Sequence, residues 1–350
     1  MYTKEEIIEE IITIREEIGH DFVEPEIKDM YLNDNELTII APDRPEKSII
    51  IGKGGWVVGK LREKLGFKSI HVISYTDIIL KEYQLELSVK HVHNLLNEDK
   101  IPLNYIDAFT NLYTLLKQKQ EAPYNTTIIE KYIDDNVDRD CYEDSNVLVA
   151  LSGGADSSFS TLLAKSLGFN VRALTVDPGT IILPKQFRNN IDNLCDKINV
   201  EHEYVETDMT ELISDSLSGK IHPCGRCSKS IHKKLEEKLS EHGYDMMIFG
   251  DLLSTGSQSV VINGENIRIN LPALFRMEKS EVKNIITKYD VKKIKGYGCP
   301  LIVQVHKKYP QYRPFSIQRV LRETRAGILE PGEALDLIRT IWLPLMPHKL

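Results

Sequence analysis

Hydrophobic and polar positions follow different patterns in three parts of the chain, of which the first comprises residues 1–76. Apolar residues recur at helical spacing over residues 5–18, and short apolar runs at residues 36–41 and 70–74 predict strands. Between these strands, two apolar stretches that we expect to be helical flank a glycine-rich turn at residues 52–55. The pattern therefore predicts an N-terminal domain of the α+β class.

Residues 77–145 carry a different pattern, which is helical and strongly charged. The pattern breaks at Ile101 and Pro102, and no turn chemistry suggests a sheet. We therefore expect a helical connector between two domains.

From residue 146 the pattern becomes that of a parallel sheet. Residues 147–151 form a continuous apolar run, which is typical of a strand buried on both faces. Strand-like and helix-like segments then alternate as in βαβ units: helices at 157–167, 185–198 and 228–239, and strands at 171–176, 202–205 and 245–249. The predicted fold class is α/β, a doubly wound, Rossmann-like parallel sheet in a domain of residues 146–350 with a C-terminal helical extension.

Composition and charge add to this prediction in only a few respects. The chain has 350 residues, 41% of them hydrophobic, which is enough for two or three domains. Its net charge of −8 gives no general argument for nucleic acid, so any basic surface must be local. The N-terminus reads as an acidic amphipathic helix rather than a signal peptide, and no run of eighteen apolar residues occurs. We therefore expect a soluble cytoplasmic protein.

The loop after the first strand of the sheet carries the clearest candidate chemistry. Beyond the carboxyl end of a parallel strand, loop amides and a helix N-terminus attract an anion, and the two glycines allow close approach of phosphate. Asp156 would repel phosphates unless it binds Mg²⁺ or orders the loop, so its presence favours a nucleotide with a metal. The alternative is an ordinary glycine-serine turn. The candidate ATP-binding residues are Ser152, Gly153, Gly154, Asp156, Ser157 and Ser158.

The sequence Ser-Gly-Gly-Ala-Asp-Ser at residues 152–157 resembles the Ser-Gly-Gly-x-Asp-Ser signature of the PP-loop ATP pyrophosphatase superfamily. Members of that superfamily split ATP between the α- and β-phosphates and form an adenylated substrate and pyrophosphate. The resemblance implies ATP and Mg²⁺ as cofactors. The motif is specific to the superfamily and not to one substrate.

Two further acids follow strands of the predicted sheet. Asp177 is placed to reach a ribose or adenine edge, although a turn role before Pro178 and Gly179 is an equal alternative. Asp251 could bind Mg²⁺ or position ATP, or it could cap a helix.

Three of the five cysteines form a candidate metal site. Cys224 and Cys227 form a Cys-x-x-Cys pair, and Cys299 lies further along the chain. Three thiolates can hold a [4Fe-4S] cluster and leave one iron open. A zinc ion, with His222 or His232 as a further ligand, and metal-free redox chemistry with Cys299 as a persulfide carrier are the alternatives.

This cysteine spacing resembles that of the tRNA-thiolating branch of the superfamily, in which three cysteines hold such a cluster. The resemblance implies adenylation of a uridine or cytidine carbonyl oxygen, followed by attack of sulfur carried on the open iron. The candidate catalytic residues are Asp156, Asp251 and Cys299. Residues 249–259 also resemble a segment of 4-thiouridine synthetases, but neither a THUMP domain nor a rhodanese domain is evident. The modified nucleoside therefore stays open.

The segment 51–61 resembles the Ile-Gly-x-x-Gly-x-x-Ile-x-x-Leu core of a KH domain, with valine where the second isoleucine is usual. In KH folds a Gly-x-x-Gly turn clamps the backbone of single-stranded RNA. Lysines also outnumber acids around this turn. A glycine turn beside a solvated lysine face is the alternative. The candidate RNA-binding residues are Gly52, Lys53, Gly54, Gly55 and Lys60.

Together these patterns predict an ATP-dependent tRNA sulfurtransferase that releases AMP and pyrophosphate. The expected partners are tRNA and a sulfur donor, either sulfide or a persulfide carrier protein; we expect no membrane partner, and a homodimer is one of the open oligomeric states. Two other functions remain open: a PP-loop enzyme that thiolates or amidates a small molecule, and a non-catalytic RNA-binding protein that senses nucleotide. The arginine-rich stretch 309–325 is a second candidate RNA surface.

Overall fold

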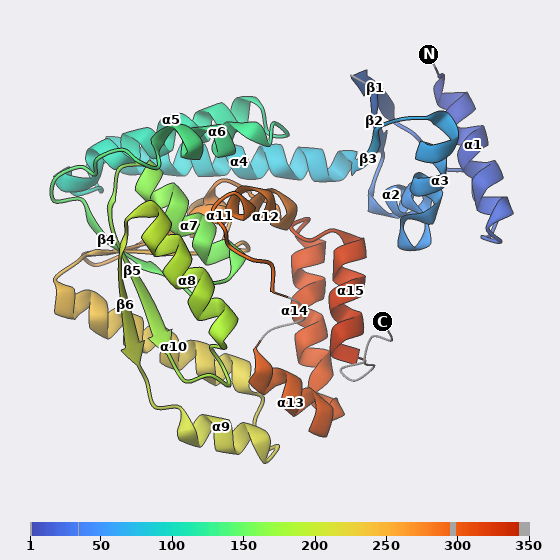
Figure 1. The fold of residues 1–350 in the computed structure, drawn as a ribbon. Coiled ribbons are helices and arrows are strands. Elements are labelled where there is room, and N and C mark those ends of the chain that lie inside the picture. Colours follow the sequence, from blue (N-terminus) through green and yellow to red (C-terminus); the bar gives the residue numbers. More distant parts are fainter. Residues whose placement is uncertain (1, 34, 295–298, 343–350) are drawn as a thin grey trace. The chain divides into compact units, whose positions relative to one another are not determined.

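The computed structural model describes residues 2–33, 35–294 and 299–342. The chain divides into two compact units, Met1–Tyr83 and Gln84–Leu350, each with its own hydrophobic core (Figure 1). None of the helices in these described ranges is long and apolar enough to cross a membrane.

The first unit folds in the order helix, strand, strand, helix, helix, strand (Figure 1). The central strand β2 pairs antiparallel with β1 and parallel with β3. Apolar side chains from α1, α2, α3 and the sheet form a single core. The glycine turn lies between α2 and α3, as the sequence pattern predicts. The elements are α1 (Lys4–Glu17), β1 (Asp29–Asn33), β2 (Glu36–Ala41), α2 (Arg44–Ile51), α3 (Trp56–Leu65) and β3 (Ser69–Ser74).

The second unit is built on a six-stranded sheet in the order β6-β5-β4-β7-β9-β8. Strands β4, β5, β6, β7 and β9 run parallel, and β8 pairs antiparallel with β9 at the edge. The predicted α/β fold class is confirmed. The chain order reverses at β4, so the loops after β4 and β7 meet at one crevice. The strands are β4 (Asn146–Ala150), β5 (Asn170–Asp177), β6 (Glu201–Glu206), β7 (Met246–Phe249), β8 (Val260–Asn263) and β9 (Asn266–Asn270).

Helices cover both faces of this sheet (Figure 1). Val147 and Val149 of β4 face a core shared with α7 (Ala155–Ser166) and α8 (Lys185–Ile198), whereas Leu148 faces a second core with α10 (Pro223–His242). Because alternate residues of a strand point to opposite faces, a strand that is covered on both sides has apolar residues throughout. This explains the continuous apolar run of β4.

Residues 77–145, expected as a connector, pack into the core of the second unit. The helices of this stretch are α4 (Tyr75–Asn97), α5 (Ile106–Glu121) and α6 (Thr127–Asn136), and buried residues from all three join the core that contains β4. A buried ion pair fixes α5 further, because Lys119 Nζ lies 3.0 Å from Glu281 Oε1. From Gln84 onward these helices therefore belong to the same compact unit as the sheet.

The C-terminal part of the described chain is helical, as expected. α12 packs against α7, and α14 lies beside α15 with a small apolar core between them (Figure 1). The remaining helices of the second unit are α9 (Thr210–Leu217), α11 (Leu271–Leu274), α12 (Lys279–Thr287), α13 (Pro300–Lys308), α14 (Arg313–Arg325) and α15 (Pro331–Trp342).

Candidate active site

The glycine-rich loop joins β4 to the N-terminus of α7, where backbone amides favour an anion. Gly153 has a φ of +72°, in the left-handed region. A Cβ at this position would lie 2.4 Å from the carbonyl oxygen of Phe187 on α8. Only glycine therefore fits between the loop and α8.

Hydrogen bonds fix the shape of this loop. The Ser152 amide donates to Ser157 Oγ at 3.1 Å, and Ser157 Oγ donates to the Gly154 carbonyl at 3.2 Å. Asn190 Nδ2 donates to the Gly153 carbonyl at 3.1 Å. Ser158 is fully buried, so its hydroxyl does not face the crevice. The structure therefore places Ser152 and Ser157 in the loop itself and Ser158 behind it.

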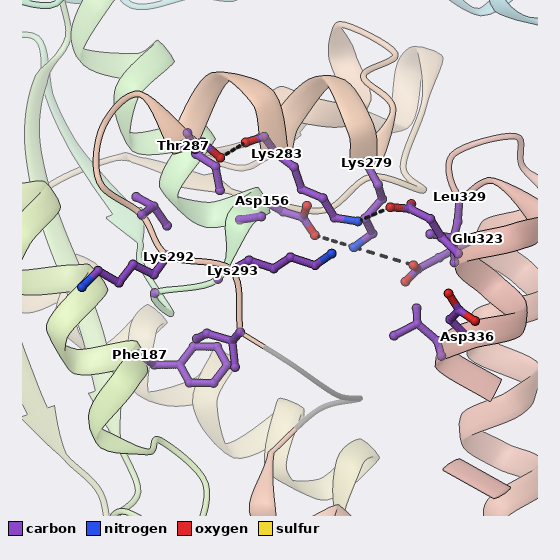
Figure 2. Close-up of a pocket in the computed structure, with 18 of the residues that line it drawn as sticks. Asp156, Phe187, Lys279, Lys283, Thr287, Lys292, Lys293, Glu323, Leu329 and Asp336 are labelled. Carbon is purple, nitrogen blue, oxygen red and sulfur yellow. Dashed lines mark hydrogen bonds and ion pairs between the residues drawn. The ribbon is translucent and has the colours of Figure 1, made fainter. Parts of the chain in front are cut away.

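A cavity of about 530 Å³ opens beside the loop and is lined by α12, α14 and α15 as well (Figure 2). Its cationic residues come from segments that the sequence analysis did not connect with ATP. Figure 2 shows the Lys293 side chain extending into the cavity, whereas Lys292 points away from it. The charged lining residues are Asp156, Lys279, Lys283, Lys292, Lys293, Arg319, Glu323, Glu333 and Asp336.

Lys279 connects the loop to the C-terminal helices. Its Nζ donates to Asp156 Oδ2 at 2.8 Å and lies 3.7 Å from Glu323 Oε2 on α14 (Figure 2). Burial opposes the charge on Lys279, but the two carboxylates outweigh this effect and raise the pKa of the lysine. Lys279 is therefore a fixed cation beside the glycine-rich loop.

The second oxygen of Asp156 fits a role in binding Mg²⁺. Asp156 Oδ1 is buried and has no hydrogen-bond partner among the residues that the structure describes. A buried carboxylate oxygen without a donor is costly, and Mg²⁺ prefers oxygen ligands of this kind. The residue is thus suited to hold Mg²⁺ beside a bound phosphate.

The two other predicted acids have partners of their own. Asp177 Oδ1 accepts hydrogen bonds from the Gly179 amide at 3.0 Å and from Arg188 at 2.5 Å, which is the geometry of the turn role. Asp251 Oδ2 accepts from Arg268 at 2.8 Å, and both side chains are exposed. Gly250, just before Asp251, lies against the loop, because a Cβ there would be 2.7 Å from the Ser157 amide nitrogen. Asp251 is thus next to the crevice, at the end of β7.

The three predicted cysteines gather where two helices begin. Cys224 lies in the first turn of α10 and Cys227 directly after it, Cys299 is the N-cap residue of α13, and the two helices pack together. All three thiols are partly buried. Helix N-termini favour the negative charge of a thiolate. The fold therefore brings Cys299 to the Cys-x-x-Cys pair.

The pKa values of these thiols reflect their proximity. Burial and then the charges of Cys299 and Cys224 raise the pKa of Cys227 to about 11. Burial and the charge of Cys299 raise the pKa of Cys224. Within the described ranges, no three Cys, His, Asp or Glu side chains converge closely enough to hold a single metal ion. As a donor set, three thiols match the thiolate ligands that an iron–sulfur cluster takes.

Arg319 belongs to the lining of the cavity and also influences the pKa of Cys224. The residue lines the cavity, and its Nε lies 3.6 Å from Glu323 Oε1. Its charge also lowers the pKa of Cys224, against the larger effect of burial, so the guanidinium is within electrostatic reach of that thiol. Ion pairs therefore link Asp156, Lys279, Glu323 and Arg319 in sequence.

The sequence analysis missed Lys279, Lys293 and Glu323, and it considered Arg319 only as part of an RNA surface. No local motif marks these residues, because none of them follows a strand of the predicted sheet. Lys279 and Glu323 read as ordinary surface charges on helices, and Lys293 lies in the segment after α12. Only the packing of α12, α14 and this segment near the loop reveals them.

Comparisons with known proteins cover the part of the chain that carries this site. Residues 146–235, which include the glycine-rich loop and the Cys-x-x-Cys pair, match the family model of the queuosine biosynthesis protein QueC. An uncharacterized protein of Methanocaldococcus jannaschii, MJ1638, is 36% identical over 191 residues, which are 55% of this chain and 72% of that protein.

Two relatives have named activities. The tRNA-specific 2-thiouridylase MnmA of Protochlamydia amoebophila is 28% identical over 180 residues, which are 41% of this chain and 48% of that protein. The 7-cyano-7-deazaguanine synthase of M. jannaschii is 30% identical over 102 residues, which are 29% of this chain and 40% of that protein.

Among solved structures, the U34-tRNA thiolase NcsA from Methanococcus maripaludis, with its [4Fe-4S] cluster, aligns with a TM-score of 0.35 and 17% identity. The alignment covers 63% of this chain and 80% of that chain. A structural likeness at this level does not by itself identify a function.

Proposed function

Because the chain belongs to the PP-loop ATP pyrophosphatase superfamily, we propose that it is an ATP-dependent tRNA sulfurtransferase. In this proposal the enzyme adenylates a carbonyl oxygen of a tRNA base and replaces that oxygen with sulfur. One observation carries the proposal: Arg319 lines the cavity beside the glycine-rich loop, and its charge also acts on the thiol of Cys224. An enzyme that first activates a group with ATP and then delivers sulfur to it needs both chemistries in one site.

In the first step, the glycine-rich loop binds the phosphates of ATP through its amides and the N-terminus of α7. The free oxygen of Asp156 holds Mg²⁺, and Lys279 and Lys293 neutralise charge on the phosphates. The base oxygen attacks the α-phosphate, and pyrophosphate leaves. Asp251, at the end of β7, is placed to act on the same nucleotide or its metal.

In the second step, sulfur attacks the adenylated carbon, and AMP leaves with the original oxygen. The donor set of Cys224, Cys227 and Cys299 fits a [4Fe-4S] cluster, which when bound would supply an iron without a protein ligand as the place for sulfur. The protein contributes two helix N-termini that favour thiolates. Arg319 stabilises negative charge that develops between the glycine-rich loop and the cysteines.

The RNA substrate is proposed to bind the first unit through its glycine turn. Gly52, Gly54 and Gly55 all have a positive φ, so the turn presents backbone without side chains. Lys53 lies within the turn, and Lys60 lies one turn into α3. The order of the elements and the position of the turn between two helices support an RNA-binding role of the KH type.

A small-molecule substrate is the second candidate. The match to the QueC model and the identity to a 7-cyano-7-deazaguanine synthase favour it. In that case the first unit would not be needed for turnover. Dependence on tRNA separates the two functions.

The proposal is tested by measuring pyrophosphate release from ATP by the anaerobically purified protein, with and without bulk tRNA. We expect release to depend on tRNA and the absorption spectrum to show a cluster. The variant Asp156→Asn should lose pyrophosphate release by about 100-fold or more, because one oxygen ligand of Mg²⁺ and the charge that holds Lys279 are removed. Turnover without tRNA by a colourless protein would contradict the proposal.

The cysteines have a matched control within the chain. Cys141 is an exposed cysteine outside the proposed donor set. We expect Cys299→Ser to abolish the cluster absorption and sulfur transfer, and Cys141→Ser to leave both unchanged. Equal effects of the two variants would remove the support for a three-cysteine site.

A further inference from the structure

We propose that Trp56 is a stacking platform for an unpaired RNA base beside the glycine turn. This inference rests on the proposed RNA-binding function and adds a base contact to it. Trp56 is the first residue of α3 and follows directly after Gly55. Its side chain is 66% exposed. An exposed indole ring beside a proposed RNA site offers a large apolar face on which a base can stack.

The turn holds this ring in a fixed place. A Cβ on Gly52 would lie 2.2 Å from Cγ2 of Val57, and Val57 is fully buried in the core of the unit. The glycine turn is therefore folded tightly against the residue next to the tryptophan. Because Val57 is anchored inward, the neighbouring Trp56 side chain leaves the helix at a defined position on the surface.

The ring lies next to backbone that carries no side chain. A Cβ on Gly54 would be 3.4 Å from Cδ1 of Trp56, so the indole edge runs along the glycine. Gly54 and Gly55 both have a positive φ, which residues with side chains rarely adopt. A nucleotide can therefore approach the ring and the turn at the same time.

Charge around the ring favours a nucleic acid over an apolar protein partner. Lys53 precedes the ring in the turn, and Lys60 lies four residues after it, on the same side of α3. Lys60 Nζ lies 3.8 Å from Glu17 Oε2, and both side chains are exposed. Breaking this ion pair therefore costs little free energy when a phosphate competes for the lysine. Aromatic rings flanked by cations are the arrangement with which proteins bind single-stranded RNA.

Fluorescence isolates this contact, because the chain has only two tryptophans, Trp56 and Trp342. The Trp342→Phe variant of the full chain leaves Trp56 as the single reporter. We expect a short single-stranded oligouridylate to quench its fluorescence, with the same saturation curve as fluorescence anisotropy of the labelled RNA. Duplex RNA of the same length should quench much less, since its bases are already stacked.

Substitution of Trp56 measures how much stacking contributes to RNA affinity. Stacking of one base contributes about 1–3 kcal/mol, so Trp56→Ala should weaken binding by about 5- to 150-fold and Trp56→Phe much less. The control is Phe22→Ala, which removes an equally exposed ring from the same unit and should leave affinity unchanged. Circular dichroism confirms that each variant folds.

The outcomes separate the two proposals. If RNA binds but neither quenches Trp56 nor responds to Trp56→Ala, the stacking proposal is wrong and the RNA-binding function stands. If the unsubstituted protein binds no RNA by anisotropy, the proposed RNA-binding function fails as well. If Trp56→Ala changes self-association in sedimentation and leaves RNA affinity unchanged, the ring serves a protein contact and the stacking proposal is wrong.

Discussion

The proposed coupling of ATP-dependent activation to sulfur transfer depends on Arg319. Its guanidinium pairs with Glu323 at 3.6 Å and lowers the pKa of Cys224, while burial raises that pKa. A cation near a thiol favours the thiolate, which is the form that reacts and binds metal.

We predict that Arg319→Gln raises the pKa of Cys224 further and slows its alkylation by iodoacetamide at neutral pH several-fold in cluster-free protein. Mass spectrometry of the labelled peptide measures this rate. Arg322→Gln, on the same helix and exposed, serves as the control and should alkylate like the unsubstituted protein. Equal rates in all three proteins would show that Arg319 does not act on the thiol.

The pH dependence of Cys227 follows from its surroundings. Burial and then the charges of Cys299 and Cys224 raise its pKa to about 11, so the thiol stays protonated through neutral pH. In cluster-free protein we predict that alkylation of Cys227 keeps rising with pH toward about 11. Since ligation requires thiolates, affinity for iron should fall as pH is lowered. Titration of Cys227 near the ordinary value of a free cysteine would contradict this account.

At the scale of elements, the glycine-rich loop is held by the helix that faces it. Gly153 combines a positive φ with a close approach to the Phe187 carbonyl oxygen on α8. A side chain there would displace either the loop or the helix.

We predict that Gly153→Ala destabilises the protein by about 1–3 kcal/mol and abolishes ATP-dependent pyrophosphate release. The melting temperature should fall by about 2–4 °C per kcal/mol for a unit of this size. Gly332→Ala on α15 is the control, because a Cβ there meets nothing within 4 Å and should be neutral or slightly stabilising. A normal melting temperature for Gly153→Ala would show that the loop tolerates a side chain.

Most elements of the sheet domain could be predicted from sequence, because buried strands and amphipathic helices leave strong periodic patterns. β2 and α8 begin and end as predicted. The hairpin of β8 and β9 was missed, although Asn263-Gly264 between two apolar runs is a recognised turn signal. β1 was missed because it is short and none of its side chains at residues 29–32 is buried.

The site could be predicted only where local motifs mark it. The loop at residues 152–157 and the Cys-x-x-Cys pair have fixed spacings, so the sequence reveals them directly. No motif of fixed spacing marks Lys279 and Arg319. Their place in the site depends on how α12 and α14 pack. That Cys299 joins the other two cysteines was predicted from resemblance alone, and the N-termini of α10 and α13 bring it there.

At the scale of the whole molecule, the account assigns separate tasks to the two units. The first presents a glycine turn with an exposed tryptophan, and the second combines a phosphate loop with three thiols. In the proposed function, ATP binds the loop of the second unit and RNA binds the glycine turn of the first.

The most direct test of the central claim is to incubate the anaerobically purified, full-length protein with ATP, Mg²⁺, sulfide and unmodified bulk tRNA, and then to identify the nucleosides of the digested tRNA by mass spectrometry. The account predicts a thiolated uridine or cytidine that forms only with ATP, and that is lost in Asp156→Asn and Cys299→Ser but kept in Cys141→Ser. The absence of any thionucleoside, while the same protein releases pyrophosphate with a small-molecule acceptor alone, would contradict it.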